Sequence, residues 1–466
     1  MNDAGLTWIG PPPDAIEAAG DKVRARRLAV DAGLEIVPGT TDPVDAGGVR
    51  AFGAVQGYPV AIKAAGGGGG RGLKIVHGPG EIDESLVAVR REARAYFGSD
   101  DVYVERYLQA PKHLEVQILG VQSDEILWLG IRDCSLQRRH QKLIEETPPV
   151  RFEHLAEPMG QAAVALGRAC GYSNAGTVEM LVDDEGRFFF LEINARLQVE
   201  HTVTEEVLGI DLVACQLRIA AGDDLGFTQE DVRPRGHAIE CRINAEDPGR
   251  GFMPTPGRLD RMVEPSGPGV RVDSGYGSGD EVPAVYDSLI SKLITTGETR
   301  EQARRRMLRA LSEFEIVGLS TTIPAHRLLL EDEAFIAGTH TTVTVERDGI
   351  LSSLEGAPAA DHNETDRVLV IGNHEARLWN PAMARSTSSK DTGSASDGAV
   401  RTPMHATVLK VMVDLGIEVA AGDALMVLEA MKMETVVRAT HAGTVAEINA
   451  AAGQTVAEGQ ILVTLS

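Results

Sequence analysis

The chain has 466 residues, of which 43 % are hydrophobic, and its 68 acidic residues outnumber its 45 basic residues, giving a formal net charge of −23. This length allows about two to four domains, and the acidic balance disfavours nucleic-acid and anionic membrane partners. The sequence contains no apolar run long enough for a membrane span, no signal peptide at Met1–Gly5 and no C-x-x-C pair among its four cysteines. We therefore expect a soluble, cytoplasmic protein with reduced cysteines.

The predicted secondary structure mixes helices and strands up to about residue 345. Asp14, with Glu17 three residues later, is expected to cap a first helix, and Asp21 is expected to begin a second helix that ends at Gly33. Mixed strands are expected between about residue 221 and the helix predicted over 300–314. Periodicity and turn residues predict helices over 79–96, 156–171, a segment ending near 221, and 300–314, and strands over 59–64, 72–77, 102–107, 113–119, 125–131, 175–182 and 187–193.

A glycine-rich stretch joins the strands predicted over 59–64 and 72–77. Gly66 to Gly70 are five consecutive glycines, with Lys63 before them and Arg71 after them. Glycine lets the backbone approach a ligand closely and aim successive N–H groups at an anion, so the stretch suggests a lid over phosphates. No Gly-Lys-Ser/Thr follows, which excludes a Walker A loop, and the stretch joins two strands, which argues against a dinucleotide fingerprint. A floppy hairpin is the alternative.

The hairpin predicted from 175–182 and 187–193 carries two glutamates. If Glu185-Gly186 is a two-residue turn, Glu179 faces Glu192 directly, and Asn194 lies on the same face. Opposed like charges destabilise a sheet unless a cation lies between them, and carboxylates with phosphate oxygens are ligands that magnesium favours. We therefore predict a divalent-metal site here, with a solvated hairpin face as the alternative.

Two dense polar segments suggest an oxyanion site. Residues 138–142 read Arg-Arg-His-Gln-Lys, and 194–201 read Asn-Ala-Arg-Leu-Gln-Val-Glu-His. A basic run in so acidic a chain indicates an anionic partner. Strand-like alternation over 194–200 would place Asn194, Arg196, Gln198 and Glu200 on one face, where Glu200 could remove a proton. An ion-paired surface strand is the alternative.

The C-terminal part changes character. Residues 382–399 are rich in Ser, Thr and Gly, a composition typical of a flexible linker. The sequence then repeats itself with a spacing of 37 residues: Thr407-Val408, Gly416, Val419, Gly422 and Leu425 recur as Thr444-Val445, Gly453, Val456, Gly459 and Leu462. Two matched halves predict a small pseudo-symmetric all-β domain, with Lys432 at the tip of the hairpin that joins them.

These motifs together resemble a known family. Residues 1–345 resemble the biotin carboxylase component of biotin-dependent carboxylases, an ATP-grasp enzyme, and 400–466, with Ala-Met-Lys-Met-Glu at 430–434, resemble a biotin carboxyl carrier domain. The fold class that this implies is an α+β ATP-grasp enzyme with an all-β appendage. Its enzyme part would be an ATP-grasp core over 1–225, with a lid at about 35–107, followed by a mixed α/β biotin carboxylase C-terminal domain over 226–345. A partly disordered linker region over 346–399 would then lead to a biotinyl domain with a flattened barrel over 400–466.

The resemblance also implies a role for individual residues. Lys432 would carry biotin as an amide on its ε-nitrogen, and Glu200 would deprotonate bicarbonate. Arg242 would stabilise the biotin enolate. Bicarbonate would be bound by Lys142, Arg196, Gln198 and Val199. The ligands of Mg²⁺ or Mn²⁺ would be Glu179, Glu192 and Asn194. ATP would be bound by Lys22, Lys63, Gly67, Gly68, Gly69, Gly70, Glu105, Leu108, His113, Gln137 and His140.

The implied function is the ATP- and bicarbonate-dependent carboxylation of biotin on Lys432, the first half-reaction of an acyl-CoA carboxylase of the acetyl- or propionyl-CoA type in fatty acid metabolism. The implied partners are a carboxyltransferase (β) subunit and a biotin protein ligase. Met1 falls just before Trp8-Ile9-Gly10-Pro11, where the first domain of the family would be ending, so we expect that domain to be missing and homo-oligomerisation to depend on its presence.

Two alternative functions remain open at this point. In the first, a truncated and catalytically weak chain acts mainly as a biotinylated carrier that docks with a carboxyltransferase. In the second, a different ATP-grasp carboxylate–amine ligase carries a lipoyl-like appendage. Two smaller departures from the family are Pro-Met-His-Ala at 403–406 in place of Pro-Met-Pro-Gly, and a 346–399 segment too short for the domain that joins carrier and partner in some relatives.

Overall fold

The computed structural model describes most of the chain. Predictions made for Gly67 to Gly70, for Lys432 and for 382–397 fall outside the described residues, as does the side chain of Lys22. None of the described helices is long and apolar enough to cross a lipid bilayer. The described ranges are 4–40, 42–64, 72–97, 100–122, 125–347, 349–354, 356, 367–371, 374–378, 398–402, 406–430, 433–457 and 459–466.

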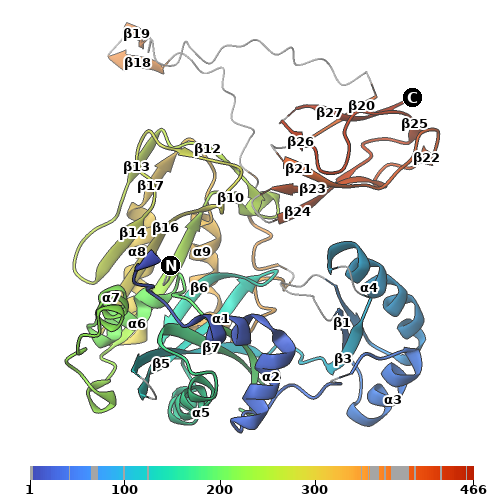
Figure 1. The fold of residues 1–466 in the computed structure, drawn as a ribbon. Coiled ribbons are helices and arrows are strands. Elements are labelled where there is room, and N and C mark those ends of the chain that lie inside the picture. The colour runs from blue at the N-terminus through green and yellow to red at the C-terminus, as the bar shows by residue number, and fades with distance from the viewer. Residues whose placement is uncertain are drawn as a thin grey trace.

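An antiparallel sheet of eight strands organises the first 345 residues (Figure 1). Its strand order is β14-β16-β9-β6-β5-β4-β7-β8. The pairing of β6 with β9 joins the two parts predicted as 1–225 and 226–345, so one hydrogen-bonded sheet runs through both. The strands are β4 (Lys112–Gln122), β5 (Glu125–Arg138), β6 (Gln141–Thr147), β7 (Asn174–Val182), β8 (Phe188–Asn194), β9 (His237–Asn244), β14 (Val270–Ser274) and β16 (Leu289–Gly297).

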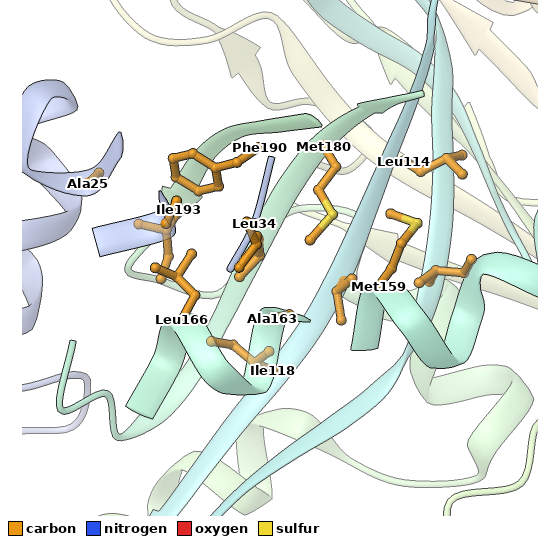
Figure 2. Packing of buried hydrophobic residues seen from close by; sticks show 14 of the residues in the cluster. Ala25, Leu34, Leu114, Ile118, Met159, Ala163, Leu166, Met180, Phe190 and Ile193 are labelled. Atoms are coloured by element: carbon orange, nitrogen blue, oxygen red, sulfur yellow. The ribbon is translucent and has the colours of Figure 1, made fainter. Parts of the chain in front are cut away.

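Helices cover both faces of this sheet. On one face, α5 (Ala156–Ala169) and α2 (Lys22–Asp31) pack over β4, β7 and β8, and Figure 2 shows Met180, Phe190 and Ile193 of the sheet close to Leu166 of α5 and the neighbouring apolar side chains. On the other face lie α6 (His201–Leu208) and α7 (Leu212–Ala221), with Leu212 packed over Leu119, Leu127 and Ala175. Successive residues of a strand point to opposite faces, so β4 can supply both layers.

Residues 44–106 form a smaller unit with its own core. The three-stranded antiparallel sheet β2-β1-β3 packs against two helices through a buried cluster that includes Val49, Ile62, Val89 and Val104. The β1–β2 pairing extends to Lys63↔Leu73, and the glycine-rich stretch separates the two strands in the sequence. The elements are α3 (Ala46–Gln56), β1 (Val60–Ala64), β2 (Leu73–Val76), η2 (Pro79–Glu81), α4 (Ile82–Phe97) and β3 (Val102–Arg106).

The elements outside the two sheets described above include α8, which packs on the central sheet. Met307, Ala310 and Leu311 of this helix pack on Ile239 and Cys241 of β9. The remaining elements are short, and β18 and β19 form a separate hairpin. These elements are α8 (Arg300–Glu313), α9 (Ile323–Glu331), α10 (Glu333–Ile336), β10 (Glu246–Asp247), β11 (Met253–Pro254), β12 (Gly257–Arg258), β13 (Arg261–Val263), β15 (Glu281–Val282), β17 (Glu315–Val317), β18 (Arg367–Ile371), β19 (His374–Leu378), α1 (Pro13–Gly20), η3 (Glu153–Leu155), η4 (Gln229–Asp231) and η5 (Pro248–Arg250).

The C-terminal domain confirms the internal repeat. Two four-stranded sheets, β20-β27-β25-β22 and β24-β23-β21-β26, contain corresponding strands at corresponding places. The symmetry extends to side chains, because Arg438 donates to the carbonyl of Gly422 (2.8 Å) and Arg401 donates to that of Gly459 (3.2 Å). The two arginines are 37 residues apart, and so are the two glycines. The strands are β20 (Ala399–Arg401), β21 (Ala406–Val411), β22 (Glu418–Val419), β23 (Ala424–Ala430), β24 (Met433–Arg438), β25 (Gly443–Ile448), β26 (Thr455–Val456) and β27 (Ile461–Leu465).

Two helix boundaries differ from prediction. Asp14 does not cap the first helix, because Pro12 occupies the N-cap position and Pro13, which has no N–H to satisfy, begins the helix. The helix predicted to continue to about residue 221 is two helices. Gly209 ends α6 in the left-handed conformation, and the Asp211 side chain accepts from Ala214 N (2.7 Å) to begin α7.

Candidate active site

A row of polar side chains runs across the α6 face of the central sheet. Strand alternation places His113, Glu115 and Gln117 of β4 on this face, while Leu114 and Val116 point to the α5 core. All of these residues are buried. Buried polar groups require partners, so the row needs a complete set of hydrogen bonds. The other members of the row are Arg132 of β5, Lys142 of β6, and Thr177 and Glu179 of β7.

Lys142 is the centre of this row. Its Nζ donates to Glu115 (2.7 Å), Glu179 (3.0 Å) and Glu200 (2.5 Å), so three carboxylates from three elements meet at one ammonium group. Burial alone would lower the pKa of Lys142, but the neighbouring acidic groups outweigh burial and hold that pKa well above its usual value. Lys142 therefore remains charged, and it fixes the position of Glu200.

Arg242 and Glu200 form the other half of the cluster. The Arg242 Nη2 donates to Glu200 (2.9 Å), and its Nε donates to Glu145 of β6 (2.5 Å). Glu200 is buried, which opposes ionisation, yet Lys142, Arg242 and Arg132 together hold its pKa well below the usual value. Glu200 is thus an ionised carboxylate held between two cations, where an anionic substrate could compete for the same cations.

The predicted pairing of Glu179 with Glu192 is confirmed, but the predicted turn is wrong. Asp183 N donates to Arg187 O, which gives a three-residue loop rather than a two-residue turn at Glu185-Gly186. A register shift between Glu179 and Met180 compensates for the extra loop residue and restores the Glu179↔Glu192 pair. Two deviations of one residue each therefore cancel at the predicted metal site.

Several groups gather around the Glu179 carboxylate. Asn194 Nδ2 donates to Glu179 (3.0 Å) and to Glu192 (3.4 Å), and His113 Nε2 lies 3.0 Å from Glu179 Oε2. Burial would raise the pKa of Glu179, but His113 and Lys142 outweigh it and lower that pKa below its usual range. The Glu192 side chain is more exposed than that of Glu179.

The segment from 194 to 200 is not the strand that alternation predicted. Strand β8 ends at Asn194, and an irregular stretch leads to Glu200, the N-cap of α6. The irregular backbone still turns Gln198 inward, where its Nε2 donates to Glu179 (2.9 Å). Arg196 instead is exposed and contacts Asn194 Oδ1 at 3.4 Å, so it lies apart from the Lys142–Glu200 contacts. The carbonyl of Val199 accepts from Lys292 (3.0 Å).

The residues predicted to bind ATP lie in two places. Lys63 and Arg26 both donate to Glu105, which is buried between them, and Leu108 is buried just beyond β3. Gln137 is buried at the end of β5, opposite Lys142 in β6. His140 is exposed in the turn between these strands, with a positive φ of 67°.

Sequence reasoning missed the residues that support the site. Arg132 is fully buried and donates to Glu115 (2.5 Å), Gln117 (2.7 Å), Thr204 (2.9 Å) and Thr177 (3.2 Å). The alternation of polar and apolar residues at 113–117 was a usable signal for a polar inner face. No comparable signal marked Arg132, because its partners come from three other elements that are distant in sequence.

Family comparisons agree with this geometry. Residues 21–228 match the ATP-binding domain of the carbamoyl-phosphate synthase L chain, 240–347 match the biotin carboxylase C-terminal domain, and 398–465 match the biotin-requiring enzyme domain. A biotin-dependent acyl-coenzyme A carboxylase alpha3 subunit from Mycobacterium leprae is 42 % identical over 99 % of this chain and 82 % of its own length. The chain belongs to the biotin carboxylase family.

Other relatives support this membership. The biotin carboxylase of Haemophilus influenzae is 48 % identical over 72 % of this chain and 75 % of its own length. The biotin carboxylase domain of the Hydrogenobacter thermophilus 2-oxoglutarate carboxylase, solved as a dimer with MgADP, ADP and bicarbonate, superposes with a TM-score of 0.70 at 42 % identity, covering 74 % of this chain and 77 % of that one. The predicted family, fold class and enzyme class, an ATP-grasp biotin carboxylase ligase with a biotinyl domain, are confirmed.

Proposed function

We propose that this biotin carboxylase uses ATP and bicarbonate to carboxylate biotin carried on Lys432, as the first half-reaction of an acyl-CoA carboxylase of the acetyl- or propionyl-CoA type. The observation that carries the proposal is the ionised Glu200 held between Lys142 and Arg242, beside the Glu179–Glu192 pair. The pairing of β23 with β24 up to Ala430↔Met433 supports a hairpin as the carrier of the modified lysine.

The Glu179–Glu192 pair fits a hard divalent cation. The two carboxylates are directly opposed and supply the oxygen ligands that Mg²⁺ or Mn²⁺ takes. Asn194 donates its Nδ2 to both carboxylates in the structure, and a rotated amide would offer its oxygen to the metal. Among the described contacts, Glu179 has a cationic neighbour in Lys142, whereas Glu192 has none, which leaves a negative charge for the metal to neutralise. Glu179 and Glu192 would hold the Mg²⁺, whose positive charge would offset the negative charge of the phosphates.

The nucleotide would lie between the small sheet and the central sheet. Lys63 is partly exposed and its partner Glu105 is buried, so the ammonium can reach a phosphate while remaining anchored. Glu105 and Leu108 would hold adenine, and His113, Gln137 and His140 would line ribose and phosphates. Lys22 and Gly67 to Gly70 are the remaining proposed phosphate contacts.

Bicarbonate would bind where two cations already hold a carboxylate. Lys142, Arg196, Gln198 and Val199 are the proposed contacts, with Glu200 as the general base. Arg196 is exposed in the structure and would have to turn toward this cluster to contact bicarbonate. In the structure, Lys142 and Arg242 depress the proton affinity of Glu200, which makes it a weak base. An anion that draws these cations toward itself raises the pKa of Glu200 at the moment when a proton must be accepted. Arg242 would then stabilise negative charge on the ureido group of biotin.

Partners follow from the proposed reaction. A carboxyltransferase subunit would receive the carboxyl group, a biotin protein ligase would modify Lys432, and the chain would form homo-oligomers. The alpha3 subunit similarity supports the first of these partners, and the dimeric structural relative supports the last.

The test is ATP turnover by the full biotinylated chain. We expect ADP formation that requires bicarbonate and rises with free biotin, and we expect the Glu200→Gln variant to lose at least about a hundredfold of it, as for loss of a general base. A biotinylated chain without this turnover would support the carrier-only alternative. Addition of the carboxyltransferase subunit with labelled bicarbonate and either acetyl-CoA or propionyl-CoA identifies the acceptor.

A further inference from the structure

Behind Arg242 lies a pair of buried glutamates to which the proposed reaction assigns no role. Glu145 of β6 and Glu240 of β9 are register partners, and both are 0 % exposed. Glu240 and Arg242 are two residues apart on one strand, so all three side chains share the face covered by α6. Cα atoms of directly opposed residues lie about 4.5–5.5 Å apart. The two glutamates are therefore neighbours in the sheet, and both are shielded from water.

Hydrogen bonding satisfies only half of this pair. Glu145 Oε1 accepts from Arg242 Nε (2.5 Å), and Glu240 Oε2 accepts from the Thr202 hydroxyl. The other oxygens, Glu145 Oε2 and Glu240 Oε1, are buried without a hydrogen-bond partner among the described residues. Two ionised carboxylates offer only acceptors, whereas one protonated carboxyl group supplies the missing donor.

The charged surroundings favour retention of one proton. Burial and the charge of Glu145 raise the pKa of Glu240 to about 8, and burial raises the pKa of Glu145 to about 7 despite its contact with Arg242. Other charged or titratable groups also face the pair from the strands and from α6. They are Lys142 of β6, Cys134 of β5, Glu200 at the head of α6, Lys292 of β16, and Arg242 and Cys241 of β9.

We propose that Glu145 and Glu240 share a single proton and act together as positioning residues for Arg242. The ionised oxygen toward Arg242 anchors Nε, which directs Nη2 to Glu200, while the shared proton keeps the pair at one negative charge. Neither glutamate contacts Glu179, Glu192 or Asn194 among the described contacts. Loss of the shared proton would place a second negative charge beside Arg242 and draw the guanidinium away from Glu200.

This inference rests on the proposed function, and the first test uses its activity. Bicarbonate-dependent ATP turnover of the full biotinylated chain is measured from about pH 6.5 to 9.5 for wild type and Glu240→Gln, in which a neutral amide replaces the protonated acid. We expect Glu240→Gln to keep its kcat within about threefold at pH 7 and to lose the decline that wild type shows above about pH 8. Glu145→Gln, which removes the anchor of Arg242, should lower kcat/KM for free biotin at least about tenfold.

A matched control separates positioning from the mere removal of a buried acid. Glu246 is also buried with a raised pKa, but Ser288 and Asn244 hold it, so Glu246→Gln should keep the alkaline decline of wild type. An unchanged decline in Glu240→Gln would overturn the proposal. A Glu240→Gln defect at pH 7 as large as that of Glu145→Gln would also overturn it, because both groups would then be needed as anions.

A second readout does not require activity. A carboxyl group whose pKa is raised by folding holds its proton in the native state and releases it on unfolding, so stability falls as pH rises. The wild-type melting temperature should therefore fall more steeply than that of Glu240→Gln between about pH 5 and 8. Equal slopes would refute the shared proton. If the slopes differ but wild type shows no bicarbonate-dependent turnover, the proposed function fails while the proton-sharing pair stands.

Discussion

Replacement of Lys142 by methionine tests whether this lysine holds the candidate site together. Methionine preserves most of the side-chain volume and removes the charge. In the wild type, the ammonium donates to Glu115, Glu179 and Glu200 at 2.5–3.0 Å, and its side chain is only 10 % exposed. Lys142→Met therefore leaves three buried carboxylates without their common cation, and we expect a large loss of stability as well as of activity.

The size of the loss follows from this contact pattern. Removal of one partner from a buried ion pair costs about 3–5 kcal/mol, mainly because a buried charge remains uncompensated. Three carboxylates lose a partner, but Arg132 still contacts Glu115 and Arg242 still contacts Glu200. The loss of stability should therefore lie near the upper end of this range, about 5 kcal/mol, and not at three times the value for one pair. That is a third or more of the stability of a typical domain, about 5–15 kcal/mol.

The assay is urea unfolding followed by tryptophan fluorescence. Residues 400–466 contain no tryptophan, and Trp128 packs against the core beneath α5. Trp379 lies between the two parts, so the experiment is done in a Trp379→Phe background, in which the signal comes from Trp8 and Trp128 of the ATP-grasp part. Lys112→Met is the matched control, because Lys112 is also buried but, within the described part of the chain, pairs with one carboxylate, Asp133 at 2.7 Å. Its loss should be smaller, about 3 kcal/mol.

A double-mutant cycle identifies the cause of the loss. With Glu200→Gln added, one unpaired charge disappears, and the double variant should be more stable than the sum of the single losses by about 1–3 kcal/mol. The reasoning is refuted if Lys142→Met unfolds within about 1 kcal/mol of wild type, or if the two changes are additive.

Three further predictions concern other parts of the chain. Lys432→Arg should abolish the streptavidin signal of the purified chain, since arginine cannot form the amide, and a remaining signal would show a second modified residue. Glu179→Gln and Glu192→Gln should each lower metal-dependent ATP turnover at least about tenfold. In the double variant the two losses should be far from additive, because both residues act through one metal. Wild-type turnover in either single variant would mean that the pair has only a structural role. His326 is buried, which lowers its pKa to about 4. As pH falls from 6.5 to 4, this histidine should therefore lower the free energy of unfolding of wild type by up to about 3 kcal/mol. His326→Gln should reduce this loss, and equal losses in the two proteins would contradict the assignment.

The carrier domain could be predicted from sequence with little help from the structure. Its signals are local, because each turn glycine, such as Gly416 or Gly453, occupies the left-handed region at φ +83°, and the buried valines recur at a fixed spacing. Because the same pattern of turn glycines and apolar residues occurs twice at a fixed spacing, a chance occurrence of the pattern is easily excluded. The repeated Arg438–Gly422 and Arg401–Gly459 contacts belong to this pattern, although they were recognised only in the folded domain.

The Glu179–Glu192 pair was predicted correctly on an incorrect premise. Alternation along a hairpin determines which face a residue occupies, and a one-residue slip moves it to the other face. The three-residue loop introduced such a slip, and the irregularity next to Glu179 removed it. Neither deviation has a strong residue signature, so their cancellation was visible only in three dimensions.

By itself, the sequence determined that a glycine-rich stretch and two opposed carboxylates are present, and it predicts an oxyanion-binding set and a modifiable lysine. The tertiary structure decided which charges meet. Lys142 contacts carboxylates from β4, β7 and the head of α6, and Glu145 meets Glu240 across β6 and β9. Such contacts depend on strand order in the sheet and on the packing of α6 over it, and both are set by long-range burial of apolar surface rather than by any local pattern.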